Sequence, residues 1–439
     1  MAYTGPTAFL NKIRRARKEI IVATTIPNLS QRQIMLSFSY LAYCGEEIVT
    51  SNPETQILNL INTAMPQIPP IASPNPTWQV VWGPAVYTTP GALYQDNLMF
   101  VAQSQSDPSQ FVIAIRGTNF VADLDWLMDD FDVRQMMPWP PGSSVSNPQG
   151  AMMSESTSIG LQILFAMNGA TYKNGTPGPA MSLMTFLLTQ TSSAIDLCVT
   201  GHSLGGCLAG TLALYLKDNT SMWDTSGKSN VSCITFAAPT AGNAAFATYS
   251  DSRFSGAPNP PNWDPTLGTT CDAVRCDFDV APMAWISSNL SASPTASPLF
   301  SIYAPPAVNP PNIDFTQMPL LWSFAWTEVL KYVLPDVANM LSAQDYAQIV
   351  AGAAALQGTF NTEYVGDPNN GTLITYMQAF IAQAAYQHGY SYPIVLDVPA
   401  LNNTSIIVRG ATASTTTGIR MVPRLARPLM EGQRSLAAG

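Results

Sequence analysis

Residues 195–216 read IDLCVTGHSLGGCLAGTLALYL, and this stretch decides the fold. The run IDLCVT is mostly apolar and predicts a short buried strand, whereas the small and apolar residues from Cys207 onward predict a helix. Between them, GHSLG at 201–205 matches the pattern G-x-S-x-G, in which a serine stands on a tight strand-to-helix turn. The segment therefore predicts a strand, a sharp bend and a helix.

The bend at residues 201–205 has the features that a catalytic nucleophile needs. The turn forces Ser203 into a strained backbone conformation, and side chains in place of the flanking glycines would collide with the neighbouring strand and helix. The hydroxyl is lifted out of the sheet, and the helix N-terminus behind it favours developing negative charge. We therefore expect Ser203 to be a nucleophile. The alternative is a glycine-rich turn that carries an idle serine.

The flanking sequence predicts strands that alternate with helices. Apolar residues have helical spacing at 33–43 and 207–217. Runs rich in Val, Ile and aromatic residues predict strands at 78–87, 98–103, 110–116 and 231–236. Turn residues between the second and third of these runs predict that the two form a hairpin. This alternation favours the α/β class, with a mainly parallel central sheet flanked by helices and one domain over residues 1–439.

A long stretch at residues 283–380 interrupts this pattern. It begins with the proline-rich run PPAVNPPN and continues with apolar helical sequence rich in Trp, Leu and Ala. A loop of this length with helices of its own is typical of a cap or subdomain rather than a linker. We therefore expect a helical insertion or cap at 283–380.

The chain has only two histidines, which limits the choice of a general base. A serine hydroxyl is a weak nucleophile until a base removes its proton. His202 lies inside the turn and is expected to point away from Ser203, so elimination leaves His388, in the run AAYQHGYSYP. An order of serine, acid and histidine along the chain is that of α/β-hydrolases, and we expect that fold. The alternative for His388 is a surface or cap histidine at the end of a helix.

The orienting carboxylate is expected between the nucleophile and His388, after a strand. Three aspartates, Asp272, Asp277 and Asp279, lie in the run CDAVRCDFDVAP. Composition alone does not choose between Asp277 and Asp279.

Two donors are expected to bind the oxyanion of the tetrahedral intermediate. One is the backbone N–H of Leu204, the residue after the nucleophile. The other should come from the loop after an earlier central strand, where FVIAIRGTN places Gly117 and Thr118 directly behind the predicted strand. Thr118 would offer both its N–H and its hydroxyl.

Together these motifs resemble the class 3 lipases, the fungal-type triacylglycerol lipase family of the α/β-hydrolase superfamily. The matching blocks follow the family's order: IRGT at 115–118 with DWL at 125–127, GHSLGG at 201–206, FAAPTAGN at 236–243 with Phe246, DVAP at 279–282, and His388 with Tyr392. DVAP is similar to the family's D-x-V-P signature, with Ala281 in place of the usual Val, and this resemblance selects Asp279 over Asp277.

The resemblance implies a carboxylic ester hydrolase, first of all a triacylglycerol lipase, that acts on lipid or another ester at an oil–water interface. Its triad would be Ser203, Asp279 and His388, its oxyanion hole Thr118 and Leu204, and it would need no cofactor or metal. A phospholipase A1 or a soluble carboxylesterase would use the same triad. An inactive hydrolase fold that serves as a binding scaffold is the alternative of another class.

The resemblance also implies a mobile lid, at or near residues 120–126. The run Met136–Trp139 and a predicted helix with Trp322 and Trp326 are further candidates for contact with an interface. Their alternative is packing in the core or in the cap.

The composition argues against several other classes of protein. Charged residues make up 11% of the chain, against about 25% in a typical soluble protein, which favours an extracellular location. The net charge of −9 argues against nucleic acid as a partner. No signal peptide is visible, and no window of about 18 apolar residues predicts a transmembrane segment.

The six cysteines form no paired CxxC units, and with only two histidines they argue against a zinc site. Cys271 and Cys276 flank a predicted strand and are candidates for a disulfide bridge.

Overall fold

The computed structural model describes most of the chain between residues 26 and 407. The described residues are 26–50, 52–72, 78–90, 95–117, 135–140, 150–283, 286, 302, 345–350, 353, 355–358, 360–361 and 382–407. Most of the predicted insertion at 283–380, the predicted lid at 120–126 and the helix with Trp322 and Trp326 therefore lie outside them.

The described residues form a main sheet of eight strands in the order β11-β9-β8-β3-β2-β1-β6-β7. Its strands β3, β8, β9 and β11 run parallel, and β2, β1, β6 and β7 continue the sheet by antiparallel pairing. The bounds are β1 Trp78–Tyr87, β2 Asn97–Ser104, β3 Gln110–Ile115, β6 Asn168–Lys173, β7 Thr176–Ser182, β8 Asp196–His202, β9 Asn230–Phe236 and β11 Cys271–Val274. The β2–β3 pairing confirms the hairpin that the sequence predicts.

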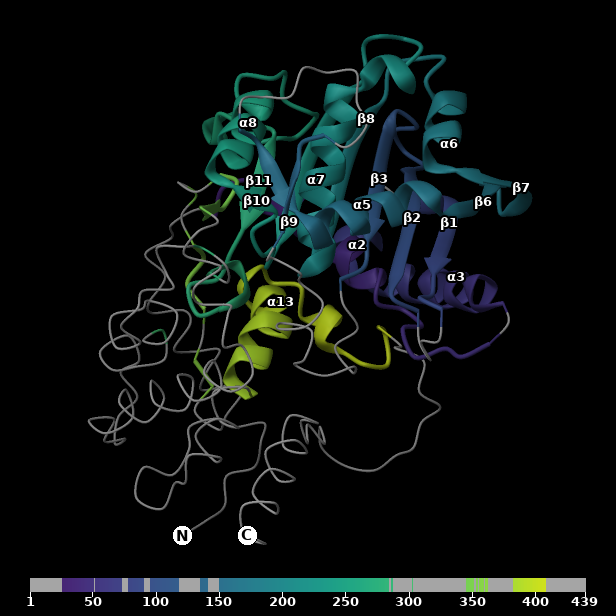
Figure 1. Ribbon diagram of the computed structural model, residues 1–439. Helices are drawn as coiled ribbons and strands as arrows, with labels where there is room; N and C mark the ends of the chain where they lie inside the picture. The colour runs from purple at the N-terminus through teal and green to yellow at the C-terminus, as the bar shows by residue number, and fades with distance from the viewer. Residues whose placement is uncertain are drawn as a thin grey trace, which may run out of the picture.

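Helices cover both faces of this sheet (Figure 1). Their bounds are α2 Leu29–Leu41, α3 Pro53–Ala64, α4 Pro69–Ala72, α5 Glu155–Ala166, α6 Leu183–Gln190, α7 Leu204–Asp218, α8 Ala244–Phe254, α13 Ser391–Val395 and a helix at 382–389. Short 3₁₀ helices occupy Met65–Gln67, Thr220–Met222, Pro265–Leu267, Ala281–Met283 and Pro399–Asn402. The predicted strand and helix around residues 201–205 are β8 and α7, which Figure 1 shows side by side.

Alternating side chains along β3 show how the sheet separates two apolar cores. Phe111, Ile113 and Ile115 face the core that α5, α6 and α7 cover. Val112 and Ala114 face the core that α2 and α3 cover. Because successive side chains of a strand point to opposite faces, an uninterrupted apolar run is what a strand buried on both sides requires.

A second, smaller sheet joins distant parts of the chain. Among the described residues its order is β12-β10-β5-β4, with β4 Met136–Pro138, β5 Met152–Ser154, β10 Gly242–Asn243 and β12 Tyr346–Ala347. Directly after β4, Trp139 is buried in the core and its ring lies 5.2 Å from that of Phe246. Of the run expected to contact an interface, Trp139 is therefore a core residue, whereas Met137 is exposed.

All six cysteines lie within the described residues and are present as thiols, so the bridge considered between Cys271 and Cys276 is not formed. The two side chains belong to different cores, on opposite faces of the sheet. The Sγ atom of Cys271 instead lies 2.8 Å from that of Cys233, its direct partner in the register of β9 and β11.

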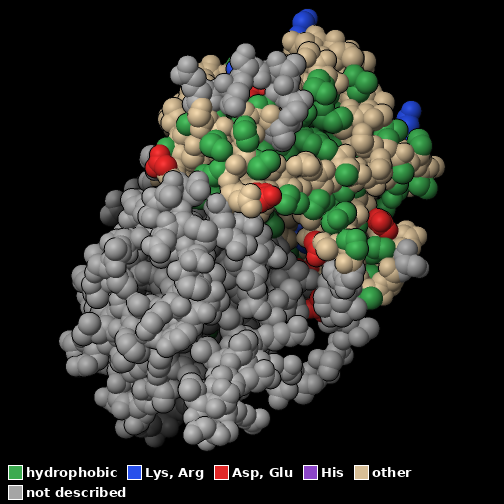
Figure 2. Space-filling model, viewed as in Figure 1, with side chains coloured by type: hydrophobic (Ala, Val, Ile, Leu, Met, Phe, Trp, Pro, Cys, Tyr) green, Lys and Arg blue, Asp and Glu red, His purple; other side chains and the backbone are tan. Residues whose placement is uncertain are grey.

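Charged side chains are sparse on the surface of the described residues. Figure 2 shows a face dominated by apolar and uncharged polar groups, with scattered Lys, Arg, Asp and Glu, as the low charged fraction predicts. None of the helices described has both the length and the hydropathy needed to cross a bilayer.

A buried ion pair ties α2 to strand β11. The guanidinium of Arg32 donates to both carboxylate oxygens of Asp272 at 2.8 Å, and the two side chains are 6% and 2% exposed. Burying two charges costs solvation, which only a geometry as good as this bidentate one offsets. Removing one partner would leave the other charge buried and unbalanced.

We therefore expect Asp272→Ala to lower the free energy of unfolding by about 3–5 kcal/mol, measured by denaturant unfolding. Arg253→Ala is the control, because Arg253 is 41% exposed and its buried partner Asp218 keeps the hydrogen bonds from the Tyr249 hydroxyl and the Trp139 indole. It should cost about 1 kcal/mol or less. Equal losses in the two variants would show that burial does not set the strength of the Arg32–Asp272 pair.

Candidate active site

The turn between β8 and α7 holds Ser203 in a conformation that is rare for a residue with a side chain. Its backbone angles are φ 61° and ψ −133°, and its side chain is buried. The N–H of Ser203 donates to the carbonyl of Phe236 at 2.9 Å, and its own carbonyl accepts from the N–H of Gly206 at 2.8 Å. Backbone strain of this kind persists only where the surroundings enforce it, and it concentrates at functional sites.

Close contacts explain the glycines on either side of the serine. A Cβ atom at Gly201 would lie 2.2 Å from the carbonyl oxygen of Gly205. A Cβ atom at Gly205 would lie 2.4 Å from the carbonyl oxygen of Ile115, on the adjacent strand β3. Both obstacles are backbone atoms, so a rotamer change cannot relieve them.

The structure brings His388 and Asp279 together from segments more than a hundred residues apart. His388 lies near the end of the helix at 382–389, and Asp279 lies in the turn after β11. The Nδ1 atom of His388 is 3.1 Å from each carboxylate oxygen of Asp279. The Asp279 side chain is fully buried and that of His388 nearly so.

Two further donors hold the carboxylate of Asp279. The Tyr392 hydroxyl donates to Oδ2 at 2.7 Å, and the N–H of Ala281 donates to Oδ1 at 3.0 Å. Burial first, and then the negative charge of Asp279, raise the pKa of Tyr392 well above its ordinary value, so this hydroxyl keeps its proton. Tyr392 also accepts from the N–H of Cys276 at 3.2 Å. These bonds fix the orientation of the carboxylate that faces His388.

The rival carboxylate of Asp277 has different contacts. Its Oδ1 atom accepts from the N–H of Gly358 at 2.7 Å. Asp277 is exposed, although partial loss of water around its carboxylate raises its pKa above the ordinary value. Of the two aspartates that composition leaves open, Asp279 is the one whose carboxylate lies against the His388 ring.

His202 connects this pair to the turn at Ser203. The rings of His202 and His388 lie 4.7 Å apart, and Nε2 of His202 is 2.7 Å from the backbone carbonyl oxygen of His388. Because His202 precedes Ser203 in the chain, these contacts place His388 beside the turn. The sequence analysis gives His202 no role, and the one signal that could have suggested these contacts is its position next to Ser203.

The structure describes one of the two predicted oxyanion donors, Leu204, but not the other, Thr118. Leu204 is the first residue of α7, where backbone N–H groups have no acceptor within the helix. Thr118 lies outside the described residues. The residue before it, Gly117, is described, and a Cβ atom there would lie 3.0 Å from the Cβ atom of Ser203. The backbone just after β3 therefore lies directly beside Ser203 at Gly117.

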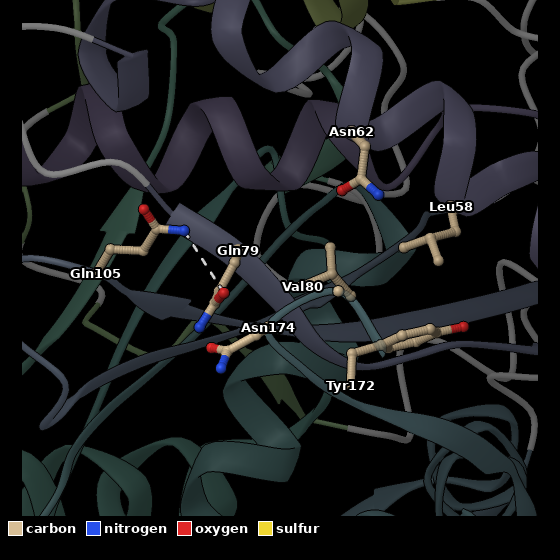
Figure 3. Close-up of a pocket in the computed structure, with 8 residues that line it drawn as sticks. Leu58, Asn62, Gln79, Val80, Gln105, Tyr172 and Asn174 are labelled. Atoms are coloured by element: carbon tan, nitrogen blue, oxygen red, sulfur yellow. Dashed lines mark hydrogen bonds between the residues drawn. The ribbon is translucent and has the colours of Figure 1, made fainter. Parts of the chain in front are cut away.

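A separate hollow lies between α3, β1 and the β6–β7 hairpin (Figure 3). Its volume is about 450 Å³, and the described residues that line it are Leu58, Asn62, Gln79, Val80, Gln105, Tyr172, Asn174 and Gly175. This set contains no serine, histidine or carboxylate, so it does not provide the groups of a serine hydrolase. Within the part of the chain that is described, no group of three or more His, Cys, Asp or Glu side chains is placed to hold a metal ion.

The chain is similar to known lipases, and the family match includes the turn at Ser203. Residues 112–257 match the family described as Lipase (class 3). The crystal structure of M37 lipase is 31% identical, with a TM-score of 0.62 and an alignment that covers 87% of this chain and 98% of that one. No curated protein matches at a significant level.

Two fungal lipase structures are more distant. Nonglycosylated LIP2 lipase of Yarrowia lipolytica is 18% identical with a TM-score of 0.38, over 58% of this chain and 73% of that one. The lipase of Rhizopus microsporus var. chinensis is 18% identical with a TM-score of 0.35, over 58% and 69%.

The sheet, the flanking helices and the turn at Ser203 are those of an α/β-hydrolase, which confirms the expected fold. The chain belongs to the class 3 lipase family. It is accordingly a serine ester hydrolase, as the motifs predict.

The close approach at Gly205 leads to a test of the turn. We expect Gly205→Ala to lower the free energy of unfolding by about 3 kcal/mol or more, because its Cβ would meet the backbone of β3. Gly210→Ala in the same helix is the control, since its Cβ would meet side chains and no backbone, the end of Ile349 at 3.1 Å and the methyl group of Thr235 at 3.8 Å. Its stability should change by about 1 kcal/mol or less, as denaturant unfolding would show. A Gly205→Ala protein as stable as the wild type would contradict this account of the turn.

Proposed function

We propose that this protein is a triacylglycerol lipase in which Ser203, His388 and Asp279 form the catalytic triad. The observation that carries the proposal is the His388–Asp279 pair, whose Nδ1–carboxylate distances are 3.1 Å, next to the strained turn that holds Ser203. A nucleophile, a base and a group that orients the base are the parts that acyl transfer from an ester requires. The class 3 lipase family supports a lipid ester as the substrate.

In the first half of the reaction, Ser203 attacks the ester carbonyl while Nε2 of His388 removes the hydroxyl proton. The ring becomes an imidazolium, and the adjacent Asp279 carboxylate stabilises its positive charge. Because Nδ1 faces Asp279, Nδ1 carries a proton before the reaction begins and Nε2 is left as the base. His388 then protonates the leaving alcohol, which produces an acyl-enzyme.

In the second half, water replaces the alcohol. His388 removes a proton from the water as it attacks the acyl carbonyl, and it returns that proton to Ser203 when the acid leaves. The negative charge on the carbonyl oxygen develops at the N-terminus of α7, where the Leu204 N–H and the helix dipole stabilise it. We assign Thr118, the residue after Gly117 in the sequence, as the second donor.

The buried carboxylate of Asp279 has the support that this role demands. Burying a charge is costly unless hydrogen bonds and an opposite charge compensate for the lost water. Tyr392 and the Ala281 N–H supply hydrogen bonds throughout, and the imidazolium supplies the charge at the moment of reaction. The attraction between aspartate and imidazolium therefore increases as the transition state forms, which is what accelerates a reaction.

Replacing the nucleophile tests the triad and the substrate together. We expect Ser203→Ala to lower kcat by at least about a thousandfold on a short p-nitrophenyl ester and on an emulsified long-chain triacylglycerol, with the thermal unfolding midpoint retained. Wild-type protein labelled by a fluorophosphonate probe, with no labelling of Ser203→Ala, completes the test.

Each other outcome has a distinct meaning. Undiminished turnover by Ser203→Ala would end the proposed mechanism. If Ser203→Ala loses activity on the short ester but the wild-type protein does not hydrolyse the emulsified triacylglycerol, the protein would be a soluble carboxylesterase. Cleavage of phospholipid in preference to triacylglycerol would point to a phospholipase A1.

Asp279 and Asp277 have different contacts, so replacing each of them tests which one orients His388. Asp279→Asn places an amide where the carboxylate faces Nδ1, and we expect kcat to fall by about 10²- to 10⁴-fold because the ring loses both its tautomer preference and its counter-charge. Asp277→Asn keeps an oxygen to accept from Gly358 and should change kcat by about twofold or less. The measurement is the steady-state kcat of both variants on the short ester. A larger loss for Asp277→Asn than for Asp279→Asn would make Asp277 the acid of the triad.

A further inference from the structure

The backbone around His388 is held by side chains from two other elements. The His388 carbonyl accepts from Nε2 of His202 at 2.7 Å, and the carbonyl of the next residue, Gly389, accepts from the Tyr40 hydroxyl at 2.5 Å. Both carbonyls lie in the last turn of the helix at 382–389, where no intrahelical N–H is available to them. We call this arrangement the backbone clamp: the side chains of His202 and Tyr40 with the carbonyls of His388 and Gly389.

The donors of the clamp are themselves fixed. His202 is fully buried at the end of β8, and its Nδ1 atom lies 3.0 Å from the Tyr43 hydroxyl. The rings of Tyr40 and Tyr392 pack edge-on against it, at 5.3 and 5.8 Å between centroids. A carbonyl oxygen only accepts, so Nε2 of His202 carries the proton in this contact.

We propose that His202 and Tyr40 are positioning residues that set the distance between the catalytic base and the nucleophile. This inference rests on the proposed function, in which His388 is the base. His202 is bonded covalently to Ser203 and hydrogen-bonded to the His388 backbone, so one rigid side chain spans the two catalytic residues. The Tyr40 hydroxyl, on α2, donates to the carbonyl of Gly389, the residue after His388. Helix α2 itself packs against β8 and β3.

Two separate constraints on His388 explain why the clamp is needed. Asp279 holds Nδ1 and sets the rotation of the ring, but it leaves the position of the backbone to other contacts. Proton transfer requires heavy atoms within about 2.6–3.2 Å, and a misplacement of about 1 Å can cost roughly a hundredfold in rate. The clamp supplies this second constraint, because it acts on the peptide that carries the ring.

The test compares kcat and KM for three variants on a soluble short ester. His202→Leu removes the donor to the His388 carbonyl, and kcat should fall by about 10- to 100-fold with KM changed by about twofold or less. His202→Gln can place an amide N–H near the position of Nε2 and should recover most of that loss. Tyr40→Phe removes one hydroxyl and should lower kcat by about threefold to tenfold.

A double-variant cycle distinguishes positioning of His388 from a general loss of structure. If His202 acts through His388, then His202→Leu should change the residual rate of His388→Ala by about twofold or less. Tyr172→Phe is the control for loss of a phenol hydroxyl, since Tyr172 lines the hollow in Figure 3, and it should leave kcat unchanged. Thermal unfolding midpoints identify any variant that fails to fold.

The possible outcomes distinguish a failure of the positioning role from a failure of the proposed function. A His388→Ala protein with the wild-type rate would overturn the function. An inactive His388→Ala protein combined with wild-type kcat for folded His202→Leu and Tyr40→Phe would overturn only the positioning role. That role would also be overturned if His202→Leu lowered the rate equally in the wild type and in His388→Ala. Should His202→Leu not fold, the kcat of Tyr40→Phe decides alone.

Discussion

The strained turn at Ser203 is the constraint on which the rest of the structure depends. A residue with a side chain occupies a positive φ there, and it does so because β8 on one side and α7 on the other are both buried and cannot shift. The turn also packs against backbone: Gly205 lies so close to Ile115 that β3, β8 and the first turn of α7 form one unit. The order β9-β8-β3 places this unit in the parallel part of the sheet, where strands on both sides restrain it.

The other two side chains of the proposed triad, His388 and Asp279, come from segments that follow this unit in the chain and pack against it. The contacts that hold them are polar and buried: Nδ1 of His388 on Asp279, the Tyr392 hydroxyl on the same carboxylate, and His202 on the His388 backbone. Each such group would be costly to bury alone, so the set is stable only when it is complete. This mutual dependence links the folding of the C-terminal segment to the assembly of the site.

The two cores, one on each face of the main sheet, explain how these side chains are held in fixed positions. One core packs α5, α6 and α7 against the sheet, and the other packs α2, α3 and the segment that contains Tyr392. The helix that follows Ser203 packs in the first core, and the tyrosines that contact the segment of His388 lie in the second, with β8 and its neighbours between them. The ion pair of Arg32 with Asp272 adds a directional bond from α2 to β11, the strand that leads into the turn of Asp279.

The sequence by itself determined the tight turn at Ser203, the strands β1, β2, β3, β8 and β9, and the helix after the turn. These features are local, because glycine spacing and apolar runs act within a few residues of one another. Composition left Asp277 and Asp279 open, and the family resemblance favoured Asp279. The tertiary structure placed the Asp279 carboxylate, and not that of Asp277, against His388. It also placed Cys271 and Cys276 in separate cores, buried Trp139, and gave His202 a partner 186 positions along the chain. Such contacts join residues that share no local pattern, so their choice depends on how the two cores pack against the sheet.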